Sequence, residues 1–217
     1  MIITGVERSK RRGRVLVYVD GEPALELGRE LARERRLTPG RTLELPEIEA
    51  LTAQDQRRLG LSTAVAMLAR RPRSEREVRQ RLVRAKLPSD IVAETIAKLR
   101  ELRLLDDAAF ARSYVESRDL CSPRGRRLIA NELRGRGVES SVACLAADAV
   151  DDDKAAYRVA CRRVQAMSSL DYRAFQNRLG GLLHRRGFGW PAVRSTVERC
   201  WRERYGTAHD DQGSVIE

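Results

Sequence analysis

Apolar residues recur at helical spacing through most of the chain, from about residue 61 onward. Val78 and Leu82 are four residues apart, and Val193 and Val197 repeat that interval near the other end. Such spacing places side chains on one face of an α-helix and does not fit the alternation of a half-buried strand. The pattern predicts nine short helices, including helices that start near Ser62, Asp107 and Asp153.

These predicted helices repeat along the chain. Leu82, Leu133 and Leu183 occupy matching places in three similar seven-residue blocks, about 50 residues apart. Any helical protein shows some self-similarity, but three matched units with matched turns favour true repeats. The turn after each leucine contains Gly137 in the second unit and Gly187 in the third, where the first unit has Lys86-Leu87. We expect three-helix repeats over 61–105, 106–150 and 151–205.

The first 50 residues follow a different pattern. Short β-type runs alternate with turn signals, of which Asp20–Gly21 is a strong hairpin signal. We expect strands at Ile2–Val6, Arg14–Val19 and Pro23–Leu27, a helix at Gly28–Leu37, a turn at Thr38–Gly40 and one more strand at Arg41–Leu45. The sequence therefore predicts a β-rich N-terminal extension over 1–50 and a polar, partly helical connector over 46–60.

The predicted fold class is mostly α. It is a tandem array of three three-helix repeats, elongated and curved, with a small β-rich N-terminal extension and a disordered tail at 206–217. In such arrays each unit contacts mainly its neighbours, and the concave side offers a long surface. That surface suits a long partner such as a filament or a nucleic acid.

Helix boundaries are marked by capping residues. Ser74 with Glu77 forms a capping box, and Ser122–Pro123 predicts a helix start with Pro at the first position. Asp106–Asp107 and the Asp151–Asp153 run stand just before apolar-periodic segments. Carboxylates there cap helices and favour the helix dipole, so we interpret them as caps rather than as metal ligands.

Composition restricts the function classes. The net charge of +11 and the pI of about 10.2 favour anionic partners, namely nucleic acid, an acidic protein surface or a membrane face. Four cysteines lie outside metal-ligand spacing and there are only two histidines, so we expect reduced, mostly structural thiols and no zinc or other cofactor. The sequence has neither a signal peptide nor an apolar run of about 20 residues, so a cytoplasmic, monomeric protein without a membrane segment is expected.

Motifs of common enzymes are absent from the sequence. There is no GxxxxGK[ST] phosphate loop, no GxGxxG after a strand, no GxSxG and no HExxH. His184, beside two arginines at a predicted helix end, is interpreted as a surface or capping residue. We therefore expect no catalytic residues and no enzyme activity.

Arginines gather around the second helix of each predicted repeat. In the second repeat Arg124, Arg127, Asn131 and Arg134 are spaced to share one helix face, away from Ile129 and Leu133. The predicted binding residues for a filament or DNA are Arg76, Arg79, Arg84, Arg124, Arg127, Arg134, Arg185 and Arg186. A basic track suits phosphates or carboxylates; the alternative is an ordinary solvated face of an Arg-rich protein. Low aromatic content argues against a stacking platform for single strands, and Trp190 and Trp201 are expected in the core.

Four blocks of this sequence resemble the signature blocks of the RecX regulatory proteins, in the expected order. They are RRPRSEREVRQRL (70–82), LLDDAAFARSYVESR (104–118), GRRLIANELRGRGV (125–138) and LLHRRGFGWPAV (182–193). VYVDGEPALELG (17–28) and LTPGRTLE (37–44) also resemble the β-rich extension of longer members. The resemblance covers all but about the last dozen residues; Lys86-Leu87 departs from it.

The resemblance implies a negative regulator of the RecA recombinase, with roles in homologous recombination, DNA repair and the SOS response. Members of the family bind the RecA filament on single-stranded DNA along its groove and inhibit ATPase, strand exchange and coprotease activity. The family offers no catalytic residues. The alternative hypothesis is a module that binds DNA directly, with its basic second helices acting as helix-turn-helix units do. A weak direct interaction with DNA is compatible with both.

Overall fold

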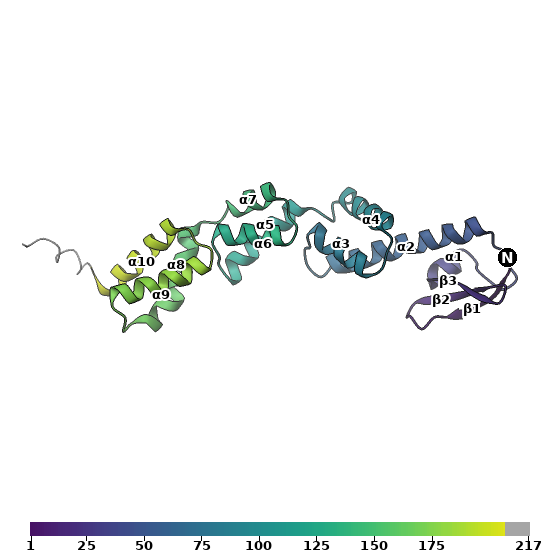
Figure 1. Cartoon of the computed structure of the whole chain (residues 1–217), viewed down its shortest axis with the longest axis horizontal. Coiled ribbons are helices and arrows are strands. Elements are labelled where there is room, and N and C mark those ends of the chain that lie inside the picture. Colours follow the sequence, from purple (N-terminus) through teal and green to yellow (C-terminus); the bar gives the residue numbers. More distant parts are fainter. Residues whose placement is uncertain (207–217) are drawn as a thin grey trace, which may run out of the picture. The chain divides into compact units, whose positions relative to one another are not determined.

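The computed structural model describes residues 1–206 (Figure 1), so the tail predicted at 206–217 lies outside the described residues except for Gly206. The described chain forms two compact units. The first contains residues 1–71 and 78–105, and the second contains residues 72–77 and everything described from 106 onward. The predicted mostly helical fold with a small N-terminal sheet is confirmed.

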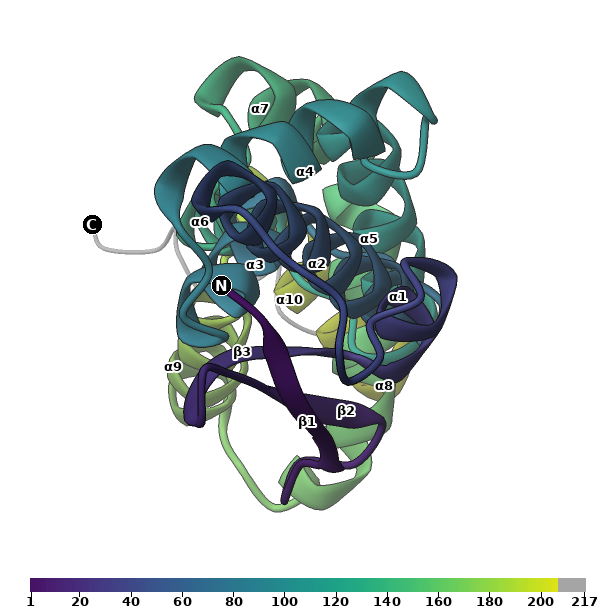
Figure 2. The ribbon, with the colours of Figure 1, turned by 90° about the vertical axis from the view of Figure 1, so that its right-hand side faces the viewer.

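The N-terminal extension is a three-stranded antiparallel meander (Figure 2), as its turn signals predicted. Its elements are β1 (Ile3–Arg8), β2 (Arg14–Val19), β3 (Glu22–Gly28) and the short helix α1 (Arg29–Glu34). Alternate residues Val15, Val17 and Val19 of β2 are buried, as expected for a sheet with one face on a core. The fourth strand predicted at Arg41–Leu45 is wrong: this segment forms an isolated bridge between Thr42 and Ile2 and a few backbone hydrogen bonds to residues 1–3, but no strand of the sheet.

The predicted connector is part of one long helix. Helix α2 (Leu45–Leu68) has Pro46 in its first turn and runs without interruption past Ser62, where a new helix was expected. Gly60 in its interior lowers the sequence signal for a helix. The structure explains that glycine, since a Cβ atom there would lie 2.7 Å from Thr95 Oγ1 of the adjacent helix.

Helix α2 is fixed to the sheet by a buried carboxylate. Asp55 is 6% exposed, and its side chain accepts a hydrogen bond of 2.7 Å from the backbone N–H of Gly28. The same carboxylate forms an ion pair of 2.7 Å with Nη2 of Arg14. A buried carboxylate needs such partners to offset its lost hydration. The extension and the first repeat therefore share α2 as a common element.

Nine helices of the described chain form the predicted three repeats. The first repeat has α2, α3 (Glu75–Arg84) and α4 (Ser89–Glu101); the second has α5 (Asp107–Cys121), α6 (Arg126–Gly135) and α7 (Ser140–Ala147); the third has α8 (Asp152–Val164), α9 (Tyr172–Arg185) and α10 (Trp190–Tyr205). A 3-10 turn, η1 (Gln165–Met167), follows α8. The matching leucines Leu82, Leu133 and Leu183 are all fully buried.

Paired aspartates connect successive repeats. Asp106 caps its own helix α5, accepting hydrogen bonds from the N–H groups of Ala108 and Ala109, and Asp151 caps α8 in the same way through Lys154. The second aspartate of each pair serves a different helix. Asp107 accepts from the N–H of Glu75 and Asp152 from the N–H of Arg126, both at 2.9 Å. Each pair therefore caps two helices, one of its own repeat and one of the preceding repeat.

The second helices of neighbouring repeats meet end to end. Ser74, before α3, donates a hydrogen bond of 2.7 Å to the carbonyl of Arg136 after α6. At the equivalent place one repeat later, the N–H of Gly125 donates at 2.9 Å to the carbonyl of Arg186 after α9. The positive end of one helix dipole thereby faces the negative end of another, which is favourable.

Glycine makes the second of these contacts possible. Gly187 has a φ of +85°, and a Cβ atom there would lie 2.3 Å from Cβ of Leu128. A Cβ atom on Gly125 would lie 2.1 Å from the carbonyl oxygen of Gly187. Lys86 replaces the glycine in the first repeat and has a φ of +61°, but it is exposed. Its left-handed turn therefore carries a side chain that points to solvent.

The helix start predicted at Ser122–Pro123 is wrong. Ser122 ends α5, and α6 begins three residues after Pro123, with Gly125 as its N-cap. The contact with Gly187 explains the shift, because it requires Gly125 at the point where the chain enters the helix.

We predict opposite effects of alanine at Gly125, the N-cap of α6, and at Gly135, its last residue. Gly125→Ala should lower the free energy of unfolding by about 1–3 kcal/mol, because its Cβ would overlap the Gly187 backbone. Gly135→Ala should raise it by up to about 1 kcal/mol, because that position is open and alanine is the better helix former. Urea denaturation of both variants tests this. Equal stabilities would contradict the role given to the contact between Gly125 and Gly187.

We predict that acid destabilises the helix starts. Backbone hydrogen bonds from Ala109 and Lys154 lower the pKa values of Asp106 and Asp151, and the Ser141 hydroxyl lowers that of Glu139. A lowered folded-state pKa contributes stability above the unfolded value, and that stability is lost as the pH falls through the folded value. The melting temperature should therefore decrease as the pH is lowered below about 4.

The matched variant is Asp106→Asn with Asp151→Asn, because asparagine still caps a helix but does not titrate there. Its midpoint should fall less than that of the unaltered chain between neutral pH and about pH 3. An identical acid-induced fall would show that these caps do not contribute to the pH dependence.

Candidate functional site

Two predicted arginines lie on an exposed face of α6. Arg127 and Arg134 are exposed and seven residues apart, which places them on one side of the helix, while Ile129 and Leu133 are buried on another. Asn131 lies between them on the same face, and its side-chain oxygen accepts a hydrogen bond from Arg134. The face predicted for the second repeat is therefore confirmed for these three residues.

Arg124 does not belong to that face. It precedes the N-cap of α6, is half-buried and forms an ion pair with Glu132. Arg118 lies 3.3 Å from the same carboxylate, and the hydroxyl of Tyr114 donates to it at 2.6 Å. Burial, followed by the charge of Arg118, lowers the pKa of Arg124. This side chain is therefore held within the second repeat.

The remaining predicted arginines lie on α3 and at the end of α9. Arg79 and Arg84 are exposed in the first unit. Arg76 is exposed in the second unit, and two of its side-chain carbons lie 2.4 Å from the place where a Cβ atom of Gly137 would be. Arg185 is exposed, whereas Arg186 is half-buried. Six of the eight predicted arginines therefore face solvent, and Arg124 and Arg186 are less accessible.

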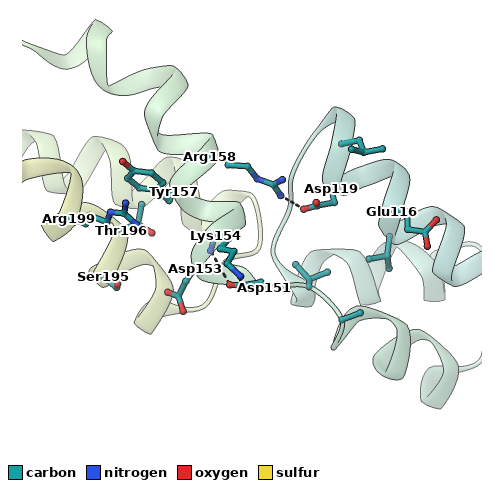
Figure 3. Close-up of a pocket in the computed structure, with 14 residues that line it drawn as sticks. Glu116, Asp119, Asp151, Asp153, Lys154, Tyr157, Arg158, Ser195, Thr196 and Arg199 are labelled. Atoms are coloured by element: carbon teal, nitrogen blue, oxygen red, sulfur yellow. Dashed lines mark hydrogen bonds and ion pairs between the residues drawn. The ribbon is translucent and has the colours of Figure 1, made fainter. Parts of the chain in front are cut away.

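A groove of about 820 Å³ lies between the second and third repeats (Figure 3) and was not predicted. Its apolar lining comes mainly from Val115 and Leu120 of α5 and from Ala149 and Val150 before α8. The Leu120 side chain is 76% exposed. The sequence did not reveal this groove because its walls come from segments far apart in the chain.

Charged groups surround the groove, mostly in pairs. Arg158 of α8 binds Asp119 of α5, and Lys154 lies 3.0 Å from Asp151 (Figure 3). Glu116 also lines the groove and forms no ion pair with another described residue. An apolar floor with a partly unneutralised acidic edge disfavours phosphates and suits an apolar side chain of a protein partner.

One wall of the groove is stiffened by a network on the third repeat. The guanidinium of Arg199 lies 3.7 Å from the ring centroid of Tyr157. The Tyr157 hydroxyl donates a hydrogen bond of 2.6 Å to Glu203, which raises the pKa of Tyr157 to about 12. These contacts hold the tyrosine ring beside the groove.

Trp190 is the most exposed aromatic side chain of the described residues, at 62%. The expectation that it lies in the core is therefore wrong, whereas Trp201 is half-buried against Phe175 and Tyr172. Trp190 stacks on His184, with ring centroids 4.6 Å apart. The position of Trp190 in the first turn of α10 leaves its indole outside the repeat.

Residues 1–206 contain neither a metal-binding cluster nor a membrane-spanning helix. No group of three or more His, Cys, Asp or Glu side chains is arranged to hold a metal ion there. None of the helices there has the length and hydrophobicity needed to cross a membrane. The four cysteines are free thiols; Cys200 alone is buried, and burial raises its pKa to about 11.

Family models match two of the three repeats. The model of the first three-helix domain of RecX matches residues 61–99, and that of the second three-helix domain matches residues 106–146. The N-terminal extension and the third repeat lie outside both matches.

Curated relatives carry the name regulatory protein RecX. The protein of Levilactobacillus brevis is 36% identical over 141 residues, which cover 63% of this chain and 52% of that protein. The protein of Streptomyces coelicolor is 31% identical over 140 residues, covering 63% of this chain and 74% of that protein, and that of Lactobacillus gasseri is 26% identical over 206 residues, covering 94% and 76%. The chain spans about half the length of the Levilactobacillus brevis relative.

Solved structures share the fold. A crystal structure of regulatory protein RecX matches 91% of this chain and 98% of its own, with a TM-score of 0.65 and 24% identity. The crystal structure of RecX from Lactobacillus salivarius matches 68% of this chain and 97% of its own, with a TM-score of 0.64 and 25% identity. With the repeats, the two matched domains and these relatives together, the chain belongs to the RecX family.

Proposed function

We propose that this chain is a regulator of the RecA recombinase that has no catalytic activity of its own. It binds the RecA filament on single-stranded DNA along the filament groove. Binding inhibits ATP hydrolysis, strand exchange and coprotease activity. Membership of the RecX family is the observation that carries this proposal.

The distribution of exposed arginines supports binding to a repeating partner. Each repeat presents at least one exposed arginine on its second helix, namely Arg79, Arg127 or Arg185. Contacts that are weak singly add through effective concentration when several repeats bind one filament. The net charge of +11 steers the chain toward an anionic complex and makes binding sensitive to salt.

We assign the protein part of the interface to the groove between the second and third repeats. Its apolar floor can bury a side chain that RecA presents, and Glu116 can pair with a basic residue beside it. Exposed arginines away from the groove are then available for DNA phosphates or for acidic side chains of RecA. None of the exposed arginines predicted to bind a filament or DNA lines the groove.

Direct binding to DNA without RecA is the second candidate function. The observation that favours it is the exposed pair Arg127 and Arg134 on the short helix α6. Such a face can contact phosphates through charge alone.

We predict that the full chain inhibits the DNA-dependent ATPase of the RecA protein from the same organism at sub-stoichiometric ratios. One bound regulator would restrain several filament subunits, so inhibition should exceed one-to-one titration. The measurement is steady-state ATP hydrolysis on single-stranded DNA at moderate salt. Unchanged hydrolysis together with tight, salt-sensitive binding to DNA alone would instead support the direct DNA-binding function.

We predict that Arg127→Glu with Arg134→Glu weakens this inhibition about tenfold or more while the melting curve stays normal. Both side chains are exposed, and each reversal replaces attraction by repulsion. The matched control is Arg112→Glu with Arg202→Glu, which makes the same charge change at exposed sites on other helices. Equal losses of inhibition in the two double variants would show that net charge, and not the position of Arg127 and Arg134, is responsible.

Arg124 should behave differently from these two residues. Arg124→Glu places a second carboxylate beside Glu132, so we expect lower thermal stability rather than a selective loss of inhibition. A stable Arg124→Glu protein would show that the ion pair contributes little to the fold.

A further inference from the structure

The third repeat differs from the other two at three equivalent places around Trp190. Trp190 begins the third helix of its repeat, where the first and second repeats have Ser89 and Ser140. Just before the buried leucine of its second helix, the third repeat has Gly180 and Gly181. The equivalent pairs are Arg79–Gln80 in the first repeat and Ala130–Asn131 in the second. The third repeat therefore has a large exposed ring, and it lacks the side chains that the other two repeats have at the positions of Gly180 and Gly181.

The indole ring of Trp190 is held in place on one side. His184, near the end of α9, stacks on it with an interplanar angle of 19° and a centroid separation of 4.6 Å. Since the side chain is still 62% exposed, much of its surface remains open to solvent. A ring positioned before binding loses little conformational freedom when a ligand stacks on it.

A cavity of about 430 Å³ adjoins this ring between α9 and α10. Gly180 and Gly181 form part of its wall without side chains, and Asn177 supplies an amide that can both donate and accept hydrogen bonds. Its size and its mixed apolar and amide lining suit a flat, polar-edged ring. Glu198 is the acidic group of this lining, two helical turns away from Trp190.

Both helices carry positive charge beside this cavity. Arg194 lies four residues after Trp190 on α10, so both side chains project from the same face and both line the cavity. Arg185 extends back along α9, with Nη1 3.3 Å from the place where a Cβ atom of Gly181 would be. Residues 151–206 contain twelve Lys and Arg against six Asp and Glu, a net charge of +6.

We propose that the His184–Trp190 stack is a base-stacking site for single-stranded nucleic acid, with Arg185 and Arg194 contacting the flanking phosphates. A base of a single strand is free to stack on an indole, whereas a base inside a duplex is not. Flanking guanidinium groups and a hydrogen-bonding amide favour a nucleotide over an apolar protein side chain. Stacking is tolerant of sequence because every base has a flat face.

This site is independent of RecA, and it is tested without RecA. The full chain is titrated with a short single-stranded oligodeoxythymidylate, with binding followed by anisotropy of a label on the DNA and by quenching of tryptophan fluorescence. Trp190→Ala should weaken binding about 5- to 150-fold, the usual range for loss of one stacked base. Leu145→Ala is the control, since it removes another exposed apolar side chain from the same unit and should leave binding unchanged.

The fluorescence readout separates the two tryptophans of the chain. In Trp190→Phe the DNA should still bind, because phenylalanine also stacks, but the quenching should disappear. In Trp201→Phe, which removes the half-buried indole, both binding and quenching should persist. A duplex of the same length should bind without quenching. Arg185→Ala and Arg194→Ala should each lower the slope of log affinity against log salt by about 1.

Two results would overturn the proposal. One is an unaltered affinity of a folded Trp190→Ala protein for the oligonucleotide. The other is loss of RecA inhibition in that variant without any change in DNA binding, which would make Trp190 a contact for protein. Should Trp190→Ala fail to fold, Trp190→Phe is decisive. Loss of quenching with binding retained supports the proposal, and retained quenching overturns it.

Discussion

The joint between the second and third repeats depends on the contact of two backbones without an intervening side chain. Gly125 and Gly187 meet where the start of α6 reaches the end of α9, and the Gly125 N–H donates to the carbonyl of Arg186. At the same end of α6, Asp152 accepts the N–H of Arg126. Hydrogen bonds that would complete a helix end within one repeat are thus supplied by the next. The repeats are therefore structurally dependent on one another at the ends of their second helices.

Much of this fold could be predicted from spacing and capping residues. The meander, the three repeats and the buried leucines follow from local periodicity, and Asp106 and Asp151 cap the helices that follow them. Errors arose where a contact between distant segments decides the local structure. The start of α6 moved because Gly125 meets Gly187, and α2 continues through Gly60 because α4 approaches there. No window of sequence contains both partners of such a contact.

The accessibility of the candidate binding residues also depends on contacts that the local sequence does not reveal. Arginine spacing correctly placed Arg127 and Arg134 on one exposed face, but it could not show that Arg124 turns inward to Glu132. Trp190 was expected in the core, because large aromatic side chains at helical positions usually are, but it is exposed. It lies in the first turn of α10, stacks on His184 and lines a cavity whose wall at Gly180 and Gly181 has no side chains. The sequence thus indicated that arginine and tryptophan side chains are candidates for binding. Their contacts with other side chains in the structure determine which of them are accessible.

The ends of the second helices are not the same in all three repeats, and the difference bears on how each helix is capped. At one end, the turn after α3 has the side chain of Lys86 where the other two repeats have glycine. At the other end, α9 begins about one turn earlier, relative to its buried leucine, than α3 and α6 do. The start of α9 is capped within its own repeat, where Asp171 accepts the N–H of Ala174. In the described chain, the second helix of the third repeat therefore starts without an acceptor from a following repeat, whereas α3 and α6 each use an aspartate of the repeat that follows.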